Sequence, residues 1–298
     1  MRRAGRGGFV LVSVLGALIV LTGLAAAAAY LVRTAVLGAA AIRSELFTDA
    51  LTRAGLEIAG FELFELKRPA ASVNGQQIRL DDGVVTLFVA AESGKIDLNT
   101  ATPEVLASLW ASLGLGGLAP EQFAARVKDY RDADSEPGEK GGAELQDYQA
   151  VAADRAPANA PFDQVDDIQF VLGVTPDAAR ALAPLLTVHN PGGKVSAYDA
   201  SAAVVRALPQ GASVVDRIMA LRSAPLPRSE EEAEAADKAA QESLGQAAKN
   251  FGFERTSNAY TVRVEVARGD ARRATQAILT RSRASDALYF TTDLVDRP

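Results

Sequence analysis

Residues 5–20 read GRGGFVLVSVLGALIV, a short basic head that runs into a long apolar segment. No charged residue occurs from Gly7 to Val32, and about 20 residues suffice to cross a hydrocarbon core of about 30 Å. Because arginines precede the segment, the positive-inside rule keeps the N-terminus in the cytoplasm. The sequence therefore predicts a single membrane-spanning helix with the rest of the chain on the other side. Cleavage of the segment as a secretion signal, within the small-residue tract Ala25–Ala29, is the alternative.

The helix is expected to continue well past the membrane. Apolar residues then recur at spacings of three and four, which is the period of one helical stripe: Phe47, Leu51, Ala54, Ile58, Phe61 and Phe64. The first proline is Pro69. A continuous helix from about Phe9 to Leu66 would be roughly 87 Å long. Its first half is apolar all round and its second half is amphipathic, as in the subunit of a fibre.

Composition and charge limit what the remaining chain can do. Of the 298 residues 48% are apolar, which is enough for one large domain or two small ones with real cores. The net charge is −6, and it becomes −9 once Arg2, Arg3 and Arg6 of the head are set aside. Such a body does not attract nucleic acid or anionic lipid. With no cysteine, disulfides, thiol catalysis and zinc-thiolate sites are excluded.

Sequence patterns typical of β-strands occur at the beginning and at the end of the part of the chain that follows the long helix. Residues 76–91 predict a hairpin with its turn at Asp82-Gly83. Residues 260–266 alternate between apolar and polar residues, as a half-buried strand does, and Gly269-Asp270 follows as a turn. Residues 272–283 and 287–295 are further strand candidates, the first of which could also be helical. The two regions together predict a small antiparallel sheet.

The segment between the strand regions is expected to be helical and repetitive. Residues 95–132, 161–189 and 194–224 share a polar helix start, an apolar helix, a hinge and a second helix, which indicates stacked helix-turn-helix pairs. The domain plan is 69–99 with 250–298 as an α/β domain and 100–226 as an inserted helical domain. The acidic, alanine-rich residues 227–249 are a linker or a solvated helix, and their composition favours a poorly ordered segment.

The junction Arg6-Gly7-Gly8-Phe9 before an uncharged helix resembles the leader of type IV prepilins and type II secretion pseudopilins. The resemblance implies a leader at 1–8, cut after Gly8 by a prepilin peptidase, a methylated Phe9, and a helix at 9–68 that spans the membrane at 9–32. The family usually has Glu at the fifth mature position, where this chain has Ser13. Glu is costly in a bilayer unless it is paired, and in the family it pairs with the subunit ahead. Ser13 is typical of the K-type minor pseudopilin.

Four further phrases resemble the K-type family, in the same order along the chain. They are GKIDLNTATPEVL at 94–106, DYRDADSEPGEKGGAE at 129–144, PFDQVDDIQFVLGVTP at 161–176 and TSNAYTV at 256–262. The resemblance implies an α+β fold: a pilin-like long N-terminal helix and small antiparallel sheet, with a large all-helical insertion of helix-hairpin-helix-like repeats.

In function, the resemblance implies a subunit that caps the tip of the type II secretion pseudopilus and helps nucleate its assembly. It would sit in the bacterial inner membrane with its body in the periplasm. The implied partners are I-type and J-type minor pseudopilins, with secreted cargo or the outer-membrane secretin as further contacts and no nucleic acid.

The acidic stretch 129–144 contains carboxylates that could hold a hard cation. It is not an EF-hand, because an Asp132 at position 1 would place Ala143 at position 12. Spacing alone favours a solvated loop, whereas K-type pseudopilins bind calcium in their large domain. The resemblance therefore implies Ca²⁺, with five candidate ligands: Asp132, Asp134, Glu139, Glu144 and Asp147.

A glycine hinge and two single residues also bear on function. The hinge Gly114-Leu115-Gly116 also resembles helix-hairpin-helix DNA-binding modules, which makes a signal-anchored DNA-uptake protein the alternative function. No cation flanks the hinge, however, and phosphate contacts require positive charge. The single histidine, His189, is expected at a helix end or in a loop, and Trp110 in a core. Catalytic fingerprints are lacking, so no enzyme is predicted.

Overall fold

The computed structural model describes residues 7–81, 83–152, 154–269, 271–282 and 287–297. The chain forms two compact units, residues 1–54 and 55–298. The arginines of the head and most of the expected leader lie outside the described residues.

Helix α1 spans Gly7–Gly60 and continues as a π-helical turn over Phe61–Glu65. Among the described residues it is the one helix long and apolar enough to cross a membrane. Residues 11–43 are exposed along its length, which suits a segment whose partners are lipid or other helices. The predicted continuous helix is thus confirmed, with a wider last turn.

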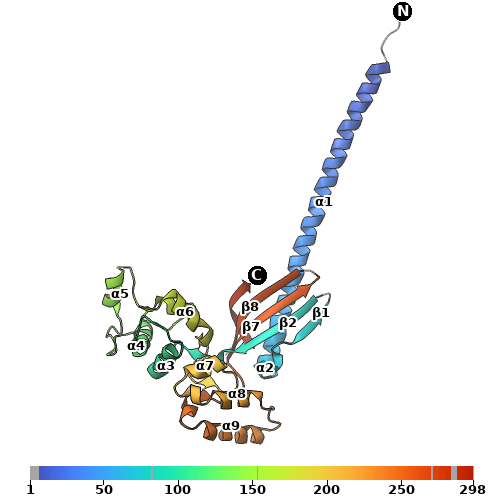
Figure 1. Ribbon diagram of the computed structural model, residues 1–298. Coiled ribbons are helices and arrows are strands. Elements are labelled where there is room, and N and C mark those ends of the chain that lie inside the picture. Colours follow the sequence, from blue (N-terminus) through green and yellow to red (C-terminus); the bar gives the residue numbers. More distant parts are fainter. Residues whose placement is uncertain (1–6, 82, 153, 270, 283–286, 298) are drawn as a thin grey trace, which may run out of the picture. The chain divides into compact units, whose positions relative to one another are not determined.

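A five-stranded antiparallel sheet has the order β1-β2-β7-β8-β9 (Figure 1). Its strands are β1 (Gln77–Leu80), β2 (Gly83–Ala91), β7 (Ala259–Arg268), β8 (Ala271–Arg281) and β9 (Tyr289–Arg297). All the predicted strands are present, and the candidate at 272–283 is a strand rather than a helix over its residues up to Arg281. The alternating burial of β2 and β7 puts Val85, Leu87, Val262 and Val264 on the inner face.

The last turns of α1 pack on this inner face. A Cβ at Gly55 would lie 2.7 Å from Val264 and 2.8 Å from Val85, so only glycine lets the helix approach so closely. Farther along the helix, the ring of Phe64 meets that of Tyr260 edge-on at 5.4 Å. The helix therefore runs toward the end of the sheet at which β2 ends and β7 begins.

The two hairpin turns differ in how closely they match the predicted turn residues. Gly83 is paired with Leu80 and therefore belongs to β2, not to the turn in which it was predicted. Asp81 has a φ of +52°, a left-handed conformation that Asp tolerates better than most residues. In the β7–β8 turn Gly269 has a φ of +55°. Asp82 and Asp270 lie outside the described residues.

Residues 92–258, between β2 and β7, form the insertion. Its α-helices are α3 (Pro103–Ser112), α4 (Pro120–Arg131), α5 (Leu145–Val151), α6 (Pro176–Leu182), α7 (Ala202–Ala207), α8 (Val215–Ser223) and α9 (Glu230–Leu244). Its 3-10 turns include η3 (Val165–Phe170) and η6 (Gly245–Asn250). Two short parallel bridges tie it together, β3 (Ile96–Asp97) with β4 (Leu186–Thr187) and β5 (Val195–Ser196) with β6 (Phe251–Gly252). The short helix α2 (Ala70–Val73) precedes the sheet.

Three helices of the predicted repeats begin with the same capping chemistry. Thr102, Thr175 and Ser201 are the N-caps of α3, α6 and α7, and each side chain accepts a hydrogen bond from the backbone three residues on. Proline follows the cap in α3 and α6, where its missing N–H costs nothing. In the second repeat the first helix is the 3-10 turn η3.

The core of the insertion surrounds Trp110, as predicted. Its ring is 1% exposed and stacks on Phe123 at 4.4 Å, and its Nε1–H donates to the carbonyl oxygen of Leu118 at 3.0 Å. Leu118 follows the α3–α4 hinge, where Gly114 and Gly117 adopt positive φ. The hinge is thus held by the core of its own hairpin.

Residues 227–249 are ordered to a greater extent than their composition favours. Ser229 caps α9 by accepting a hydrogen bond from Glu232, and three Glu residues in the first turn suit the positive end of the helix dipole. Ala240 and Leu244 are buried, and Leu244 belongs to the core that contains Trp110. Of the two possibilities, the structure has a helix, and Leu244 joins it to the core of the insertion.

Candidate metal centre

The acidic stretch 129–144 begins in the last turn of α4. Asp129 and Asp132 are three residues apart and therefore lie on the same side of the helix end. Asp129 is fully buried with its neighbours Val127 and Tyr130, because this side of α4 faces the core. Asp132 is the C-cap residue with an extended backbone, and there the chain leaves the helix.

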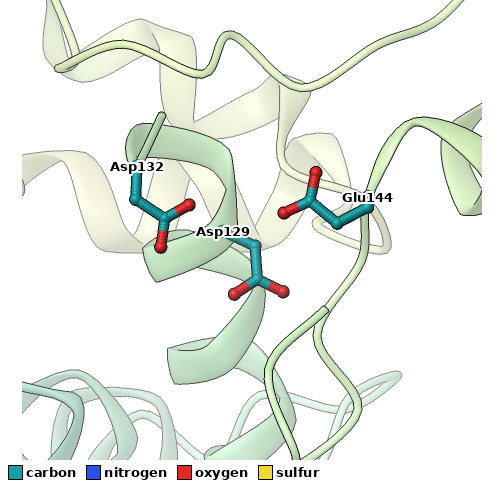
Figure 2. A group of neighbouring side chains, drawn as sticks. All are labelled: Asp129, Asp132 and Glu144. Atoms are coloured by element: carbon teal, nitrogen blue, oxygen red, sulfur yellow. The ribbon is translucent and has the colours of Figure 1, made fainter. Parts of the chain in front are cut away.

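A third carboxylate returns to this point at the start of α5. Glu144 is the N-cap of that helix and is 5% exposed. Figure 2 shows the three side chains converging from the end of α4 and from the returning loop. One carboxylate oxygen from each of Asp129, Asp132 and Glu144 lies within 4.8 Å of the others.

Most oxygens of this group have no hydrogen-bond partner among the described residues. Oδ2 of Asp129 accepts from the backbone N–H groups of Gly138 and Ala143, each at 2.9 Å. Four other oxygens are buried and without a donor: Oδ1 of Asp129, Oδ1 of Asp132, and both oxygens of Glu144. Buried polar atoms nearly always have partners, so four together indicate a missing one.

The electrostatics of the group point the same way. Burial is the largest cause that raises the pKa of Asp129, and the charge of Asp132 adds to it, although two backbone N–H groups oppose the shift. Burial also raises the pKa of Glu144, followed by the neighbouring aspartates. Lys128 offers one positive charge, at 3.4 Å from Oδ2 of Asp132. Grouped buried carboxylates are costly unless a cation joins them.

Two glycines allow the loop to close over Asp129. A Cβ at Gly142 would lie 1.9 Å from Oδ2 of Asp129 and 2.4 Å from the backbone nitrogen of Gly138. A Cβ at Gly138 would lie 3.1 Å from Oδ1 of Asp129. The Gly-x-x-x-Gly spacing therefore serves the close approach of backbone to carboxylate.

The donor set fits a hard divalent cation. Calcium binds six to eight oxygens from carboxylates, carbonyl groups and water, in geometries that vary from site to site. Three carboxylates from a helix end and from the loop that returns to it match that preference better than the strict octahedron of magnesium, and the set contains no nitrogen or sulfur ligand that would favour zinc.

Two of the five residues predicted as ligands belong to this group, Asp132 and Glu144. The other three do not: Asp134 is exposed and its Oδ1 accepts from Glu136 N–H at 2.9 Å, and Glu139 is exposed. Asp147 accepts from the backbone N–H of Glu144 at 2.9 Å, so it orients the start of α5.

Asp129 is the residue that the sequence reasoning missed. Its signal was its position three residues before Asp132, in the turn that ends an amphipathic helix. The predicted set followed carboxylate spacing and nearby glycines, whereas burial and lack of partners are what single out Asp129 as a candidate ligand.

The other residues of interest lie apart from this group. Gly8 and Phe9 are in the first turn of α1, which begins two residues before the expected start, and Ser13 is exposed on the same helix. His189 lies in a loop after β4, and its backbone N–H donates to Oγ1 of Thr187 at 3.0 Å.

The segment that contains the three carboxylates matches a known protein family, and the fold matches a solved structure. Residues 85–191, which include all three carboxylates, match the family described as type II secretion system (T2SS), protein K. A solved structure, the GspK-GspI-GspJ complex from the type 2 secretion system of enterotoxigenic Escherichia coli, contains a chain with a TM-score of 0.60. The match has 13% sequence identity and covers 86% of this chain and 96% of that one. No curated protein matches. At this identity the likeness shows the fold, and together with the family match it confirms the resemblance to K-type minor pseudopilins.

Proposed function

This chain carries the protein K domain of type II secretion on the fold of a minor pseudopilin, and from these premises we propose that it caps the tip of the pseudopilus. In this role it would help nucleate the fibre that exports folded proteins across the outer membrane. The role is structural rather than catalytic.

The main support for this proposal is the end of the sheet at which the insertion is attached. The insertion leaves the sheet after Ala91 and returns before Ala259, and the paired residues Ala91 and Tyr260 stand at that end. The last turns of α1 and the π-helical turn after it run toward the same end, from Gly55 at Val264 to Phe64 at Tyr260. A fibre of parallel pilin helices would need that space for its next subunit. Residues 92–258 occupy it, which suits a subunit with none ahead.

Ser13 supports the same position. A Glu in the hydrocarbon core costs several kcal/mol unless it finds a partner. A subunit within the fibre gains by pairing such a Glu with the neighbour ahead, whereas a terminal subunit would carry the cost without the gain. Serine is neutral, and a helical serine can satisfy its hydroxyl on its own backbone.

The proposed surroundings follow from this role. Helix α1 would anchor the chain in the inner membrane by a single pass, with the N-terminus in the cytoplasm and unit 55–298 in the periplasm. A prepilin peptidase would cut between Gly8 and Phe9. The I-type and J-type minor pseudopilins, which join GspK in the solved complex, are the proposed partners, and cargo or the secretin would meet the insertion.

The group of three carboxylates supports a second proposal, that the insertion binds calcium. Asp129, Asp132 and Glu144 would supply oxygens, and backbone carbonyl groups or water would complete the shell. Its role would be structural, since it would neutralise the buried charges and hold the loop 133–143 on the end of α4.

The tip position is tested on pseudopili sheared from cells that also produce the other pseudopilins. A gold label on the insertion should appear at one end of each fibre, and mass spectrometry of the membrane-bound chain should give a methylated Phe9. A Ser13→Glu variant should impair secretion more than its matched control Ser13→Ala. Label distributed along the fibres, or an intact Met1, contradicts the proposal.

A further inference from the structure

Residues 92–101 connect β2 to α3 and are called the joint here, since the insertion meets the sheet there. Glu92 opens the joint and is 1% exposed. Its carboxylate accepts from Nζ of Lys95 at 2.7 Å, from Oγ1 of Thr187 at 2.5 Å and from Oγ1 of Thr261 at 2.6 Å. Thr187 belongs to β4 of the insertion and Thr261 to β7 of the sheet. One buried carboxylate therefore binds both parts.

A second buried carboxylate organises the middle of the joint. Oδ1 of Asp97 accepts from the backbone N–H groups of Asn99 and Thr100, at 2.8 and 3.0 Å. Oδ2 accepts from the N–H of Asn190 at 2.8 Å. The side-chain amide of Asn190 donates in turn to three carbonyl oxygens, those of Ser93, Lys95 and Lys194. The conformation of the joint thus depends on hydrogen bonds around Asp97.

Arg131 reaches the joint from the metal centre. It precedes Asp132 in the last turn of α4. Its guanidinium group donates to the carbonyl oxygens of Leu98 and Ala101, the second at 2.9 Å. The charge of Arg131 interacts with both Asp97 and Asp132. The half-buried guanidinium of Arg131 therefore interacts both with the carboxylate that orders the joint and with a carboxylate of the metal centre.

We propose that Arg131 is a positioning residue through which a cation at Asp129, Asp132 and Glu144 stabilises the joint. This inference rests on the calcium proposal above. A bound cation would relieve the repulsion among the three carboxylates and fix Asp132, and with it the last turn of α4. The Arg131 side chain would then hold Leu98 and Ala101 in place. Calcium would thereby set how rigidly the insertion is held on the sheet.

The experiment is hydrogen–deuterium exchange of the full chain in detergent micelles, with and without calcium chloride. Two groups of amides are compared. Gly138 and Ala143, whose N–H groups bind Asp129, report on the metal centre. Asn99, Thr100 and Asn190, whose N–H groups bind Asp97, report on the joint. Isothermal titration with calcium measures the affinity of each variant.

Arg131→Gln is the test variant and Arg126→Gln is its matched control. Arg126 lies on the same helix and its guanidinium also donates to two carbonyl oxygens, those of Gly141 and Leu172, which are outside the joint. In the wild type and in Arg126→Gln, calcium should slow exchange at the joint amides about fivefold or more, the lower range of couplings between sites. In Arg131→Gln, calcium should slow exchange at the amides of Gly138 and Ala143 but not at the joint amides.

Two results would overturn the inference. One is equal slowing of the joint amides in Arg131→Gln and in the wild type. The other is a wild-type joint that calcium leaves unchanged while Gly138 and Ala143 slow. If calcium does not slow exchange at Gly138 and Ala143 in the wild type either, both the calcium proposal and the coupling through Arg131 are wrong. The proposed tip position does not depend on this result. Should Arg131→Gln not fold, Arg131→Lys keeps the charge without the two-pronged contact, and the same criteria apply.

Discussion

Glu144→Gln should change the stability of the protein in opposite directions with and without calcium. The side chain of Glu144 is buried, and neither oxygen has a hydrogen-bond partner among the described residues. The raised pKa of this carboxyl means that its charge is unfavourable in the calcium-free fold at neutral pH. A neutral amide of the same shape removes that charge and breaks no hydrogen bond of the side chain. The calcium-free variant should therefore be as stable as the wild type or more so.

With calcium the same substitution should be harmful. At a free calcium concentration of 100 times Kd the cation stabilises the wild type by about 2.7 kcal/mol. A contact to a buried charged group is worth about 1.5–3 kcal/mol, so the variant should bind calcium about 10- to 150-fold more weakly. At the same calcium concentration its stabilisation falls to about 1.4 kcal/mol or less. At 2–4 °C per kcal/mol, the calcium-induced rise in Tm should drop from roughly 5–10 °C to a few degrees.

The assay is thermal unfolding of the full chain in micelles at fixed pH, with calcium or with a chelator. Glu139→Gln is the matched control, because it removes an exposed carboxylate from the same loop. Its Tm should equal that of the wild type both with calcium and with the chelator. Destabilisation of the calcium-free protein by Glu144→Gln would refute the reasoning, since it would mean that the carboxylate makes favourable contacts. An unchanged calcium response would show that Glu144 is not a ligand.

Three further predictions concern pH, the loop and the core. Because burial raises the pKa values of Asp129 and Glu144, the folded calcium-free state binds protons more readily than the unfolded state. Its stability should rise as pH falls from 7 through these raised values, a gain that saturating calcium removes in denaturant titrations. Gly142→Ala should lower calcium affinity at least tenfold by titration calorimetry, because its Cβ would displace Asp129, and equal affinity would contradict the packing argument. Trp110→Ala should cost about 3–5 kcal/mol in urea unfolding, whereas Leu145→Ala at an exposed site should cost less than about 0.5 kcal/mol.

The extended elements were predictable because each has a local pattern. The uncharged run Gly7–Val32 and the stripe that ends at Phe64 could only form a long helix, and α1 with its π-helical turn spans both. Alternation over 260–266 predicted β7, and five strands do form one antiparallel sheet. The polar helix starts predicted for the first and third repeats contain the caps Thr102 and Ser201, whose chemistry acts within four residues.

What the sequence by itself determined, then, is the long apolar helix, the small sheet, the helical insertion and the likeness to protein K, because periodicity and short phrases are local properties. Only the tertiary structure decided that Asp129 joins Asp132 and Glu144 while Asp134 and Glu139 stay exposed. Burial and closure of the loop select among carboxylates that look alike in sequence. The order of α9 was decided in the same way, because Leu244 is buried in the core that contains Trp110, a residue distant in the chain. Composition predicts only how well such a segment is solvated, whereas its partners come from the fold.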